Sequence, residues 1–334
     1  MAPTQTPVSV ITGFLGSGKT TLINHILTGK HGKRIAVIEN EFGEVSVDDA
    51  LVMQAKEEVF EMANGCVCCT VRGDLMRILR KLMRRANAFD AVLIETTGLA
   101  DPAPVLQTFF MDDELREAYA LDALITVVDA AHIMQHLDEE KPEGVENESV
   151  EQIAFADRII LNKLDLVTPE QATTIKARIK GINAFAEILD AKHSKVPLDQ
   201  LLGIQAFSLD RILANEPDFL EDKEHEHDSS ITSVGITSEG SLHMDKLNEW
   251  LRTLLTERGA DLFRSKGVLS IKGTDDRFVF QGVHMLLEMT NSASGDVAPW
   301  KDGEPRLNRL VFIGRNLDRD ELTRSFKACL AREP

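Results

Sequence analysis

Short apolar segments rich in Val and Ile recur through the first two-thirds of the chain and alternate with segments of helical periodicity. The apolar segments span residues 7–12, 34–40, 91–97, 123–130, 157–163 and 186–191. Continuous apolar strands separated by helices are typical of a parallel sheet that is covered on both faces. The pattern therefore predicts an α/β fold with a doubly wound, mostly parallel sheet, in which ligands bind at the carboxyl ends of the strands.

The pattern changes beyond residue 207. Residues 208–229 are polar and acidic, which indicates a linker. Strands are then expected at 230–237, 262–273, 277–289 and 306–317, and helices at 243–255 and 319–331. Helices interspersed with antiparallel strands indicate a smaller α+β domain. We therefore expect an N-terminal domain over 1–207 and a C-terminal domain over 230–334.

The segment GFLGSGKT at 13–20 matches the phosphate-binding pattern G-x-x-x-x-G-K-[ST]. It follows an expected strand and opens an expected helix, a placement that the motif requires and an ordinary glycine-rich turn does not. Lys19 is expected to reach the β- and γ-phosphates of a nucleotide, and the Thr20 hydroxyl is expected to ligate Mg²⁺. The motif predicts a P-loop NTPase whose phosphate contacts come from Gly13, Gly16, Ser17, Gly18, Lys19, Thr20 and Thr21.

The tetrapeptide NKLD at 162–165 follows another expected strand and indicates which base is bound. The Asp165 carboxylate can accept hydrogen bonds from N1 and the 2-amino group of guanine, and adenine has no donor at either position. Asn162 is expected to tie this loop to the phosphate loop, and the stem of Lys163 is expected to cover the base. A solvated turn is the alternative for four residues alone. The place of the motif after a strand favours GTP and GDP as ligands.

The segment LIETTGLADP at 93–102 supplies an acidic residue near the end of a strand. Glu95 is expected to hold Mg²⁺ through water or to polarise the attacking water, and the Gly98 N–H is expected to contact the γ-phosphate. The alternative is that Glu95 only caps the following segment. Lys19, Thr20, Glu95 and Gly98 are therefore the candidates for catalysis. The segment DAKHSK at 190–195 lies where a further guanine-contacting loop is expected, but the pattern assigns no role to its residues.

Three of the four cysteines, Cys66, Cys68 and Cys69, lie within four consecutive positions. Zn²⁺ prefers tetrahedral thiolate or imidazole ligands, and no fourth ligand for a closed structural site follows nearby in the sequence. Three thiolates with an open position suit a site that accepts a soft metal ion and releases it. A single catalytic thiol does not explain three cysteines, and a disulfide between adjacent cysteines is strained. Buried apolar cysteines are the remaining alternative.

The acidic segment 38–52 lies between the phosphate loop and the cysteines. This is the place where a GTPase carries a switch that senses the γ-phosphate and changes order with the nucleotide state. Glu39 and Glu44 are candidate ligands of the soft metal ion or of Mg²⁺. The alternative is that both are solvated loop carboxylates.

The composition excludes several classes of partner. The chain has 54 Asp and Glu against 37 Lys and Arg, for a formal net charge of −17, which repels nucleic acids and anionic membranes. Neither a signal peptide nor an apolar run long enough to span a membrane is present in the sequence. The sparse, clustered cysteines indicate a reducing compartment, so we expect a cytoplasmic protein. The sequence makes no prediction of the oligomeric state.

Two residues outside these motifs have simpler interpretations. Cys329 shares a helical stripe with Leu322 and Phe326, which predicts core packing. Trp300 lies in a loop and is either a partner contact or a structural anchor.

The segments GFLGSGKTT, IENEFGEVSVDD, NGCVCC, ETTGLADP and NKLD, in this order, resemble the CobW-like family of P-loop GTPases implicated in metal delivery. The similarity is greatest to its bacterial YjiA-type and eukaryotic zinc-chaperone members, and it covers essentially the whole chain, including the C-terminal domain. The resemblance implies slow hydrolysis of GTP to GDP and phosphate. It also implies that Cys66, Cys68 and Cys69 hold Zn²⁺ and that the metal is transferred to a client metalloprotein.

Two other functions stay open beside metal delivery. One is a zinc buffer or sensor whose nucleotide site only regulates metal binding, and the other is a cobalt or nickel insertion factor, because thiolates also bind these metals. Some family members carry long histidine runs near the linker, whereas this chain has only HEHD at 225–228. That departure argues against metal storage, and we expect His225 and His227 to be solvated linker residues.

Overall fold

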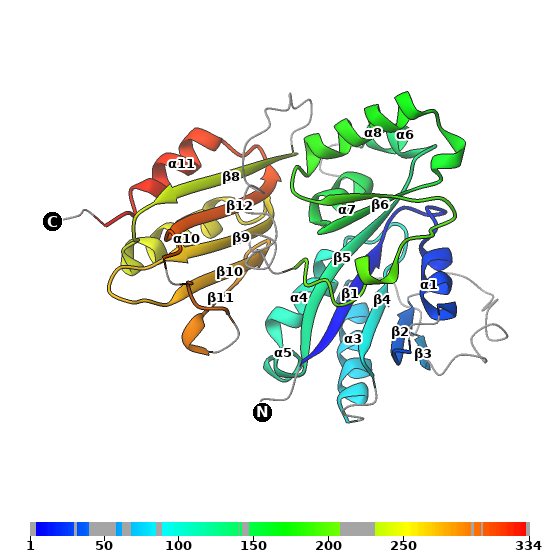
Figure 1. Ribbon diagram of the computed structural model, residues 1–334, viewed down its shortest axis with the longest axis horizontal. Helices are drawn as coiled ribbons and strands as arrows, with labels where there is room; N and C mark the ends of the chain where they lie inside the picture. Colours follow the sequence, from blue (N-terminus) through cyan, green and yellow to red (C-terminus); the bar gives the residue numbers. More distant parts are fainter. Residues whose placement is uncertain are drawn as a thin grey trace. The chain divides into compact units, whose positions relative to one another are not determined.

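The computed structural model describes two compact units, and the first ends at Phe207 (Figure 1). Residues 179–185 group with the second unit, which otherwise follows Phe207. The described residues are 5–29, 32–39, 58–61, 68–84, 89–139, 141, 147–207, 231–294, 297–301 and 303–331. The expected linker at 208–229, with His225 and His227, lies outside them.

The first unit is built on a seven-stranded sheet in which every strand pair is parallel. The strand order is β3-β2-β4-β1-β5-β6-β7. The strands are β1 Thr6–Thr12, β2 Ile35–Glu39, β3 Glu58–Glu61, β4 Ala91–Glu95, β5 Tyr119–Asp129, β6 Arg158–Asn162 and β7 Glu187–Asp190. Each of the six apolar segments of the sequence overlaps one of these strands, and β5 begins four residues before its segment, so the predicted α/β fold is confirmed. Strand β3 was not expected, because its sequence EVFE is short and acidic at both ends.

Helices cover both faces of this sheet. The described helices of the first unit are α1 Lys19–Thr28, α3 Cys68–Met83, α4 Ala103–Met111, α5 Asp113–Ala118, α6 Ile133–Leu137, α7 Glu148–Phe155 and α8 Pro169–Ile182, with 3₁₀ turns η1 Leu164–Leu166 and η2 Leu198–Gln200. On one face Ile11 and Val37 pack in a core with Leu22 and Ile26 of α1. Alternate strand residues such as Val10 are equally buried and face the other side. Among the described residues, no helix is both long and apolar enough to cross a membrane.

Helix α3 begins earlier than the sequence suggested. The sequence GDLMRILRKLM at 73–83 predicts a helix that starts at Gly73, a weak helix former, whereas the structure starts the helix at Cys68 and continues it through Gly73. The backbone of Cys68 and Cys69 therefore forms the first residues of α3. Tyr119 Oη donates a hydrogen bond of 2.9 Å to Leu79 O, which joins α3 to the start of β5.

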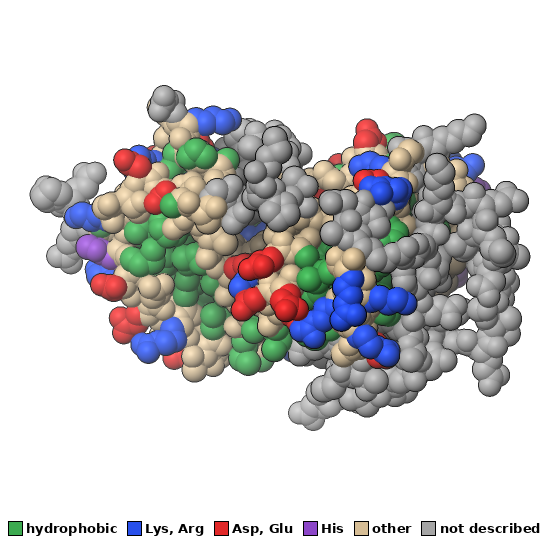
Figure 2. Space-filling model, turned by 90° about the horizontal axis from the view of Figure 1, so that it is seen from below, with side chains coloured by type: hydrophobic (Ala, Val, Ile, Leu, Met, Phe, Trp, Pro, Cys, Tyr) green, Lys and Arg blue, Asp and Glu red, His purple; other side chains and the backbone are tan. Residues whose placement is uncertain are grey.

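Basic side chains gather on the exposed side of α3, although the chain is acidic overall (Figure 2). Arg77 forms an ion pair of 2.7 Å with Asp74, one turn earlier on the same helix. Arg80 forms another ion pair of 2.7 Å with Asp112, which lies between α4 and α5. Acidic neighbours within the unit therefore balance part of this positive charge.

The second unit contains a five-stranded antiparallel sheet in the order β11-β10-β9-β12-β8. Its elements are β8 Ile231–Glu239, α10 Met244–Arg258, β9 Leu262–Ser270, β10 Arg277–Val283, β11 Leu286–Asn291, the 3₁₀ turn η3 Ser292–Ser294, β12 Leu307–Arg315 and α11 Arg319–Lys327. The expected α+β class is confirmed, but the single strand expected at 277–289 is wrong. The chain reverses at His284 and Met285, where His284 takes a φ of 53°, so the segment forms a hairpin.

Helices α10 and α11 pack on one face of this sheet. Phe312 and Phe326 are fully buried in the resulting core, and Cys329 joins them, as its helical spacing predicted. Burial raises the pKa of the Cys329 thiol. Trp300 is a structural anchor, since its Nε1 donates to Asp276 O at 3.2 Å and its ring lies 4.7 Å from the guanidinium of Arg277.

Gly267 of β9 lies directly beneath the ring of Phe280, and a Cβ at this position would lie 2.0 Å from Phe280 Cε1. Because the ring is fully buried, Gly267→Ala is expected to displace it and to lower the free energy of unfolding by about 1–3 kcal/mol. Both tryptophans, Trp250 and Trp300, lie in this unit, so urea denaturation followed by tryptophan fluorescence reports the change.

The matched control is Gly73→Ala. Gly73 is exposed in the middle of α3, and a Cβ there would meet nothing within 4 Å. This variant is expected to leave the tryptophan-fluorescence midpoint unchanged, because Gly73 lies in the first unit and alanine favours the helix. An unchanged fluorescence midpoint in Gly267→Ala would contradict the packing described for Phe280.

Candidate functional site

The loop between β1 and α1 holds its glycines in conformations that other residues rarely adopt. Gly13, Gly16 and Gly18 have φ angles of 137°, 74° and 111°. A Cβ at Gly13 would lie 2.2 Å from Val127 O, and one at Gly18 would lie 2.5 Å from Asn162 Nδ2. The loop therefore depends on glycine both for its turns and for its close contact with β5 and β6, and its backbone can wrap around a phosphate.

Lys19, the first residue of α1, folds its side chain back over this loop. Its Nζ donates hydrogen bonds to Gly13 O at 2.8 Å and to Phe14 O at 3.3 Å, and the residue is only 8% exposed. Burial lowers the pKa of Lys19, and the negative charge of Glu95 partly opposes that shift. The ammonium group is thus held at the centre of the loop by weak backbone acceptors.

The two expected Mg²⁺ ligands come together where α1 begins and β4 ends. Thr20 Oγ1 lies 3.5 Å from Glu95 Oε1. Strand β4 pairs with β1 so that Glu95 lies opposite Ile11, just before the loop begins. A hydroxyl and a carboxylate oxygen at this spacing are ligands of the kind that Mg²⁺ prefers, so the residues present fit the ion.

Gly98 lies in a β-turn that packs against the same loop. Ala100 N donates to Thr97 O at 3.1 Å and closes the turn. A Cβ on Gly98 would lie 2.6 Å from Leu15 N, so the two backbones touch at a place where a side chain would not fit. The turn follows β4, and its backbone N–H groups are therefore beside the phosphate loop.

Asn162, the last residue of β6, joins the NKLD segment to the phosphate loop. Its Nδ2 donates to Ser17 O at 2.9 Å and to Ser194 Oγ at 2.9 Å, and its Oδ1 accepts from Ser194 N at 2.8 Å. Asn162 is 2% exposed, while Asp165 in η1 is exposed beside it. The amide is therefore a structural tie, and the carboxylate is accessible to a ligand.

Lys163 has an uncommon backbone conformation, and its side chain forms an ion pair. Its φ is 61°, and its Nζ donates to Asp129 Oδ2 at 2.7 Å. His132 Nδ1 lies 2.9 Å from the same oxygen. Burial tends to raise the pKa of Asp129, but hydrogen bonds from Lys163, His132 and the Ala131 N–H lower it below its usual value. Asp129 therefore stays ionised and anchors the end of the Lys163 side chain.

Ser194 belongs to the same network, and sequence reasoning did not assign it a role. It is fully buried, and its Oγ donates to Gly18 O at 2.9 Å while contacting Asn162. His193 and Ser194 both take positive φ, at 52° and 53°. The only sequence signal was the position of DAKHSK after the strand that follows NKLD. The hydroxyl closes a three-way link between this segment, β6 and the phosphate loop.

The candidate metal ligands are described only in part. Cys68 and Cys69 begin α3, and Glu39 is the last residue of β2. Cys66 and Glu44 lie outside the described residues, as does most of the segment 38–52. Within the described part of the chain, no group of three or more His, Cys, Asp or Glu residues could hold a metal ion. The backbone places Cys68 after β3 and Glu39 at the end of β2, both at the carboxyl edge of the sheet.

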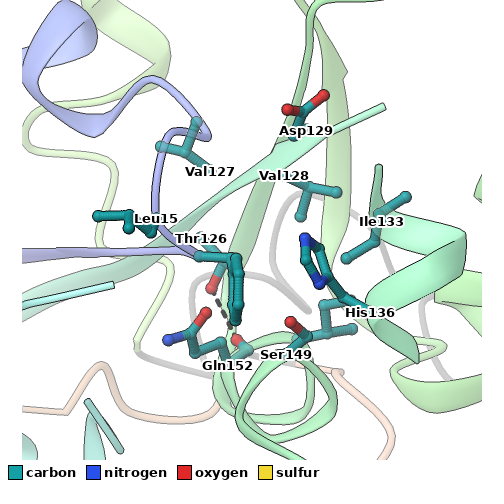
Figure 3. Close-up of a pocket in the computed structure, with 11 residues that line it drawn as sticks. Leu15, Thr126, Val127, Val128, Asp129, Ile133, His136, Ser149 and Gln152 are labelled. Carbon is teal, nitrogen blue, oxygen red and sulfur yellow. Dashed lines mark hydrogen bonds between the residues drawn. The ribbon is translucent and has the colours of Figure 1, made fainter. Parts of the chain in front are cut away.

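A pocket lies beside the phosphate loop and is lined by Phe14, Leu15 and residues of β5, α6 and α7 (Figure 3). The rings of Phe14 and His136 are stacked, with centroids 3.9 Å apart and an interplanar angle of 33°. Ser149 and Gln152 of α7 form part of its wall. None of the residues expected to hold the nucleotide lines this pocket, so it is distinct from the phosphate site.

Comparison with known proteins gives matches along both units. The family model described as the CobW/HypB/UreG nucleotide-binding domain matches residues 7–190, and that of the cobalamin synthesis protein CobW C-terminal domain matches residues 231–330. The chain is 37% identical over 326 residues to the zinc chaperone YjiA of Escherichia coli (strain K12), which covers 96% of this chain and 97% of that protein.

Two further comparisons extend this similarity. The zinc-regulated GTPase metalloprotein activator 1 of Schizosaccharomyces pombe is 33% identical over 354 residues, covering 94% of this chain and 83% of that protein. The crystal structure of Zn(II)-bound YjiA GTPase from E. coli is similar, with a TM-score of 0.75 at 33% identity, covering 98% of this chain and 99% of that one.

The link through Ser194 generates a test. Ser194→Ala removes the hydroxyl that joins Gly18 to Asn162 and is expected to weaken binding of GDP and of a GTP analogue alike, by about fivefold to tenfold. Ser194→Gly is expected to have the same effect, although glycine relieves the positive φ. Titration with fluorescently labelled nucleotides measures both affinities.

The control is Thr174→Ala, since the Thr174 hydroxyl is exposed on α8 and donates to Glu170 O, four residues earlier on the same helix. This variant is expected to bind nucleotide like the unaltered protein. Unchanged nucleotide affinity in both Ser194 variants would show that the hydroxyl does not support the site. Full recovery in Ser194→Gly would assign the effect to backbone strain.

Proposed function

This chain is a GTPase of the CobW/HypB/UreG family, and we propose that it uses GTP hydrolysis to deliver zinc to a client metalloprotein. The observation that carries the proposal is the meeting of Lys19, Thr20 and Glu95 at the carboxyl edge of one sheet. Lysine, hydroxyl and carboxylate groups placed in this way serve phosphoryl transfer by positioning and by electrostatic stabilisation.

The phosphate loop, residues 13–20, binds and orients the β- and γ-phosphates. Lys19 exchanges its bonds to the carbonyls of Gly13 and Phe14 for charge-assisted bonds to phosphate oxygens, which are stronger. Thr20 and Glu95 would hold Mg²⁺, which would neutralise charge on the phosphates. The Gly98 N–H faces the γ-phosphate from the neighbouring turn. Gly13, Gly16, Ser17, Gly18 and Thr21 complete the phosphate contacts.

The NKLD segment selects guanine. Asp165 is exposed at the start of the loop after β6, where its carboxylate can pair with N1 and the 2-amino group of the base. Lys163 covers the base with its stem, and the ion pair with Asp129 holds the stem in place. Asn162 holds this loop against the phosphate loop through its hydrogen bond to Ser17 O.

Zinc is the cargo, and Cys66, Cys68 and Cys69 are its proposed ligands. The chemistry of three thiolates supports a soft metal ion, and the backbone places Cys68 and Cys69 at the N-terminus of α3, an end that favours negative charge. The relatives named zinc chaperone YjiA and zinc-regulated GTPase metalloprotein activator support zinc over cobalt or nickel. An open fourth position lets a client ligand attack the bound metal.

Nucleotide state and metal affinity are coupled through the carboxyl edge of the sheet. Strands β3 and β1 are separated by three strand spacings, which is roughly 14 Å. Helix α3, which begins at Cys68, follows β3, and the phosphate loop follows β1. We therefore expect the metal site and the phosphate site to lie near each other. The segment 38–52, with Glu39 and Glu44, connects the two regions along the chain. A tenfold change of zinc affinity between nucleotide states requires only about 1.4 kcal/mol of coupling free energy.

Replacement of Cys66, Cys68 and Cys69 by serine tests the metal site. The triple variant is expected to lose zinc affinity by more than about 100-fold, because serine hydroxyls are poor ligands for this soft ion. Its GDP affinity is expected to change by less than about twofold, since the phosphate loop and NKLD bind the nucleotide. Chelator competition under reducing conditions measures the first, and nucleotide titration measures the second.

The matched control uses the fourth cysteine. Cys329 is buried in the core of the second unit, so Cys329→Ala is expected to leave zinc stoichiometry and affinity intact. A triple variant that kept full zinc stoichiometry and affinity would place the metal site elsewhere. Loss of zinc binding in Cys329→Ala alone would also show that the metal site is not formed by Cys66, Cys68 and Cys69.

A further inference from the structure

Gln152 of α7 contacts the turn that contains Gly98, although the two residues are far apart in the sequence. Its Nε2 donates hydrogen bonds to Gly98 O at 3.1 Å and to Ala100 O at 3.3 Å. The side chain is 1% exposed, so these bonds are shielded from water. One amide group therefore holds two carbonyls of the turn that follows β4.

The turn needs this support because its own bonds constrain it little. Among the described residues, one backbone bond closes it, from Ala100 N to Thr97 O at 3.1 Å. Gly98 touches Leu15 on one side, but glycine has no Cβ to restrict its φ and ψ angles, so the direction of its carbonyl depends on further contacts. Leu99, the next residue, is 62% exposed and gives the turn no anchor in the core. The hydrogen bond from Gln152 therefore orients the carbonyl group of Gly98.

Gln152 is itself held in place by the sheet. Thr126 Oγ1 of β5 donates to Gln152 O at 2.7 Å, a bond drawn as a dashed line in Figure 3. The side chain lies in the wall of the pocket beside the phosphate loop. Ser149, one turn earlier on α7, lines the same pocket and is 3% exposed. Within the described part of the chain its Oγ has no hydrogen-bond partner.

We propose that Gln152 is a positioning residue for GTP hydrolysis, which orients the turn 97–100 so that the Gly98 N–H meets the γ-phosphate. The inference rests on the proposed function, in which that N–H contacts the γ-phosphate. GDP has no γ-phosphate, so its binding does not depend on this contact. Gln152 is therefore expected to affect the affinity for GTP and to leave the affinity for GDP unchanged.

Gln152→Met keeps the length of the side chain and removes both hydrogen-bond donors. Affinity for a non-hydrolysable GTP analogue is expected to fall about fivefold to tenfold, and turnover of GTP is expected to fall at least as much. Affinity for GDP is expected to stay within about twofold, because the phosphate loop and the NKLD segment are intact. Titration with labelled analogue and labelled GDP, with single-turnover hydrolysis, gives the three values.

Ser149→Ala is the matched control, since Ser149 shares the helix, the pocket and the burial of Gln152. It is expected to keep all three values within about twofold, because no hydrogen bond of its Oγ to the described residues is lost. Gln152→Leu, which has a similar volume and no hydrogen-bond donor, is the second variant if Gln152→Met does not fold. It is expected to lose affinity for the GTP analogue selectively in the same way.

Equal losses for GDP and the analogue would assign Gln152 a structural role only, and unchanged values would show that it does not orient the turn. Either result overturns the inference while GTP hydrolysis by the unaltered protein still supports the proposed function. If the unaltered protein does not hydrolyse GTP, the proposed function fails, and this inference fails with it.

Discussion

Strand β4 pairs in parallel with β1, with Glu95 opposite Ile11, and this register decides which groups meet at the phosphate loop. A shift of one residue would turn Glu95 toward the opposite face and separate it from Thr20. The turn containing Gly98 follows from the same strand, so its contact with Leu15 depends on the same register. The strands are buried on both faces, and the apolar pattern fixes their pairing because a slipped strand would leave cavities in both cores.

Around this register, several side chains tie the site together through hydrogen bonds to the backbone. Lys19 bonds to carbonyls of the loop, Asn162 to Ser17 O, Ser194 to Gly18 O and Gln152 to Gly98 O. Such bonds fix the direction of peptide groups that then face a phosphate. In a chain of net charge −17, oriented N–H groups and the buried Lys19 provide a positive field at the phosphate loop.

Much of the fold followed from the sequence, because continuous apolar strands and the strand-loop-helix motif are strong local signals. Strand β3 was not predicted, because a segment of four residues with an acidic residue at each end shows little hydrophobic periodicity. The hairpin at His284 was missed because apolar residues continue through the turn, and no Gly-Asn or Pro signal marks the positive φ. Within the site, NKLD was visible as a motif. Ser194 and Gln152 were not, because their roles arise from contacts between distant segments that a single sequence does not reveal.

The central claim is that zinc and nucleotide binding are coupled across one edge of the sheet. The most direct test is zinc affinity measured by chelator competition on the reduced protein, with a GTP analogue, with GDP and without nucleotide. The account predicts that zinc affinity differs by at least about fivefold between the GTP-analogue and GDP states, a coupling of about 1 kcal/mol. Three superimposed binding curves would contradict it and would favour a zinc buffer that hydrolyses GTP independently.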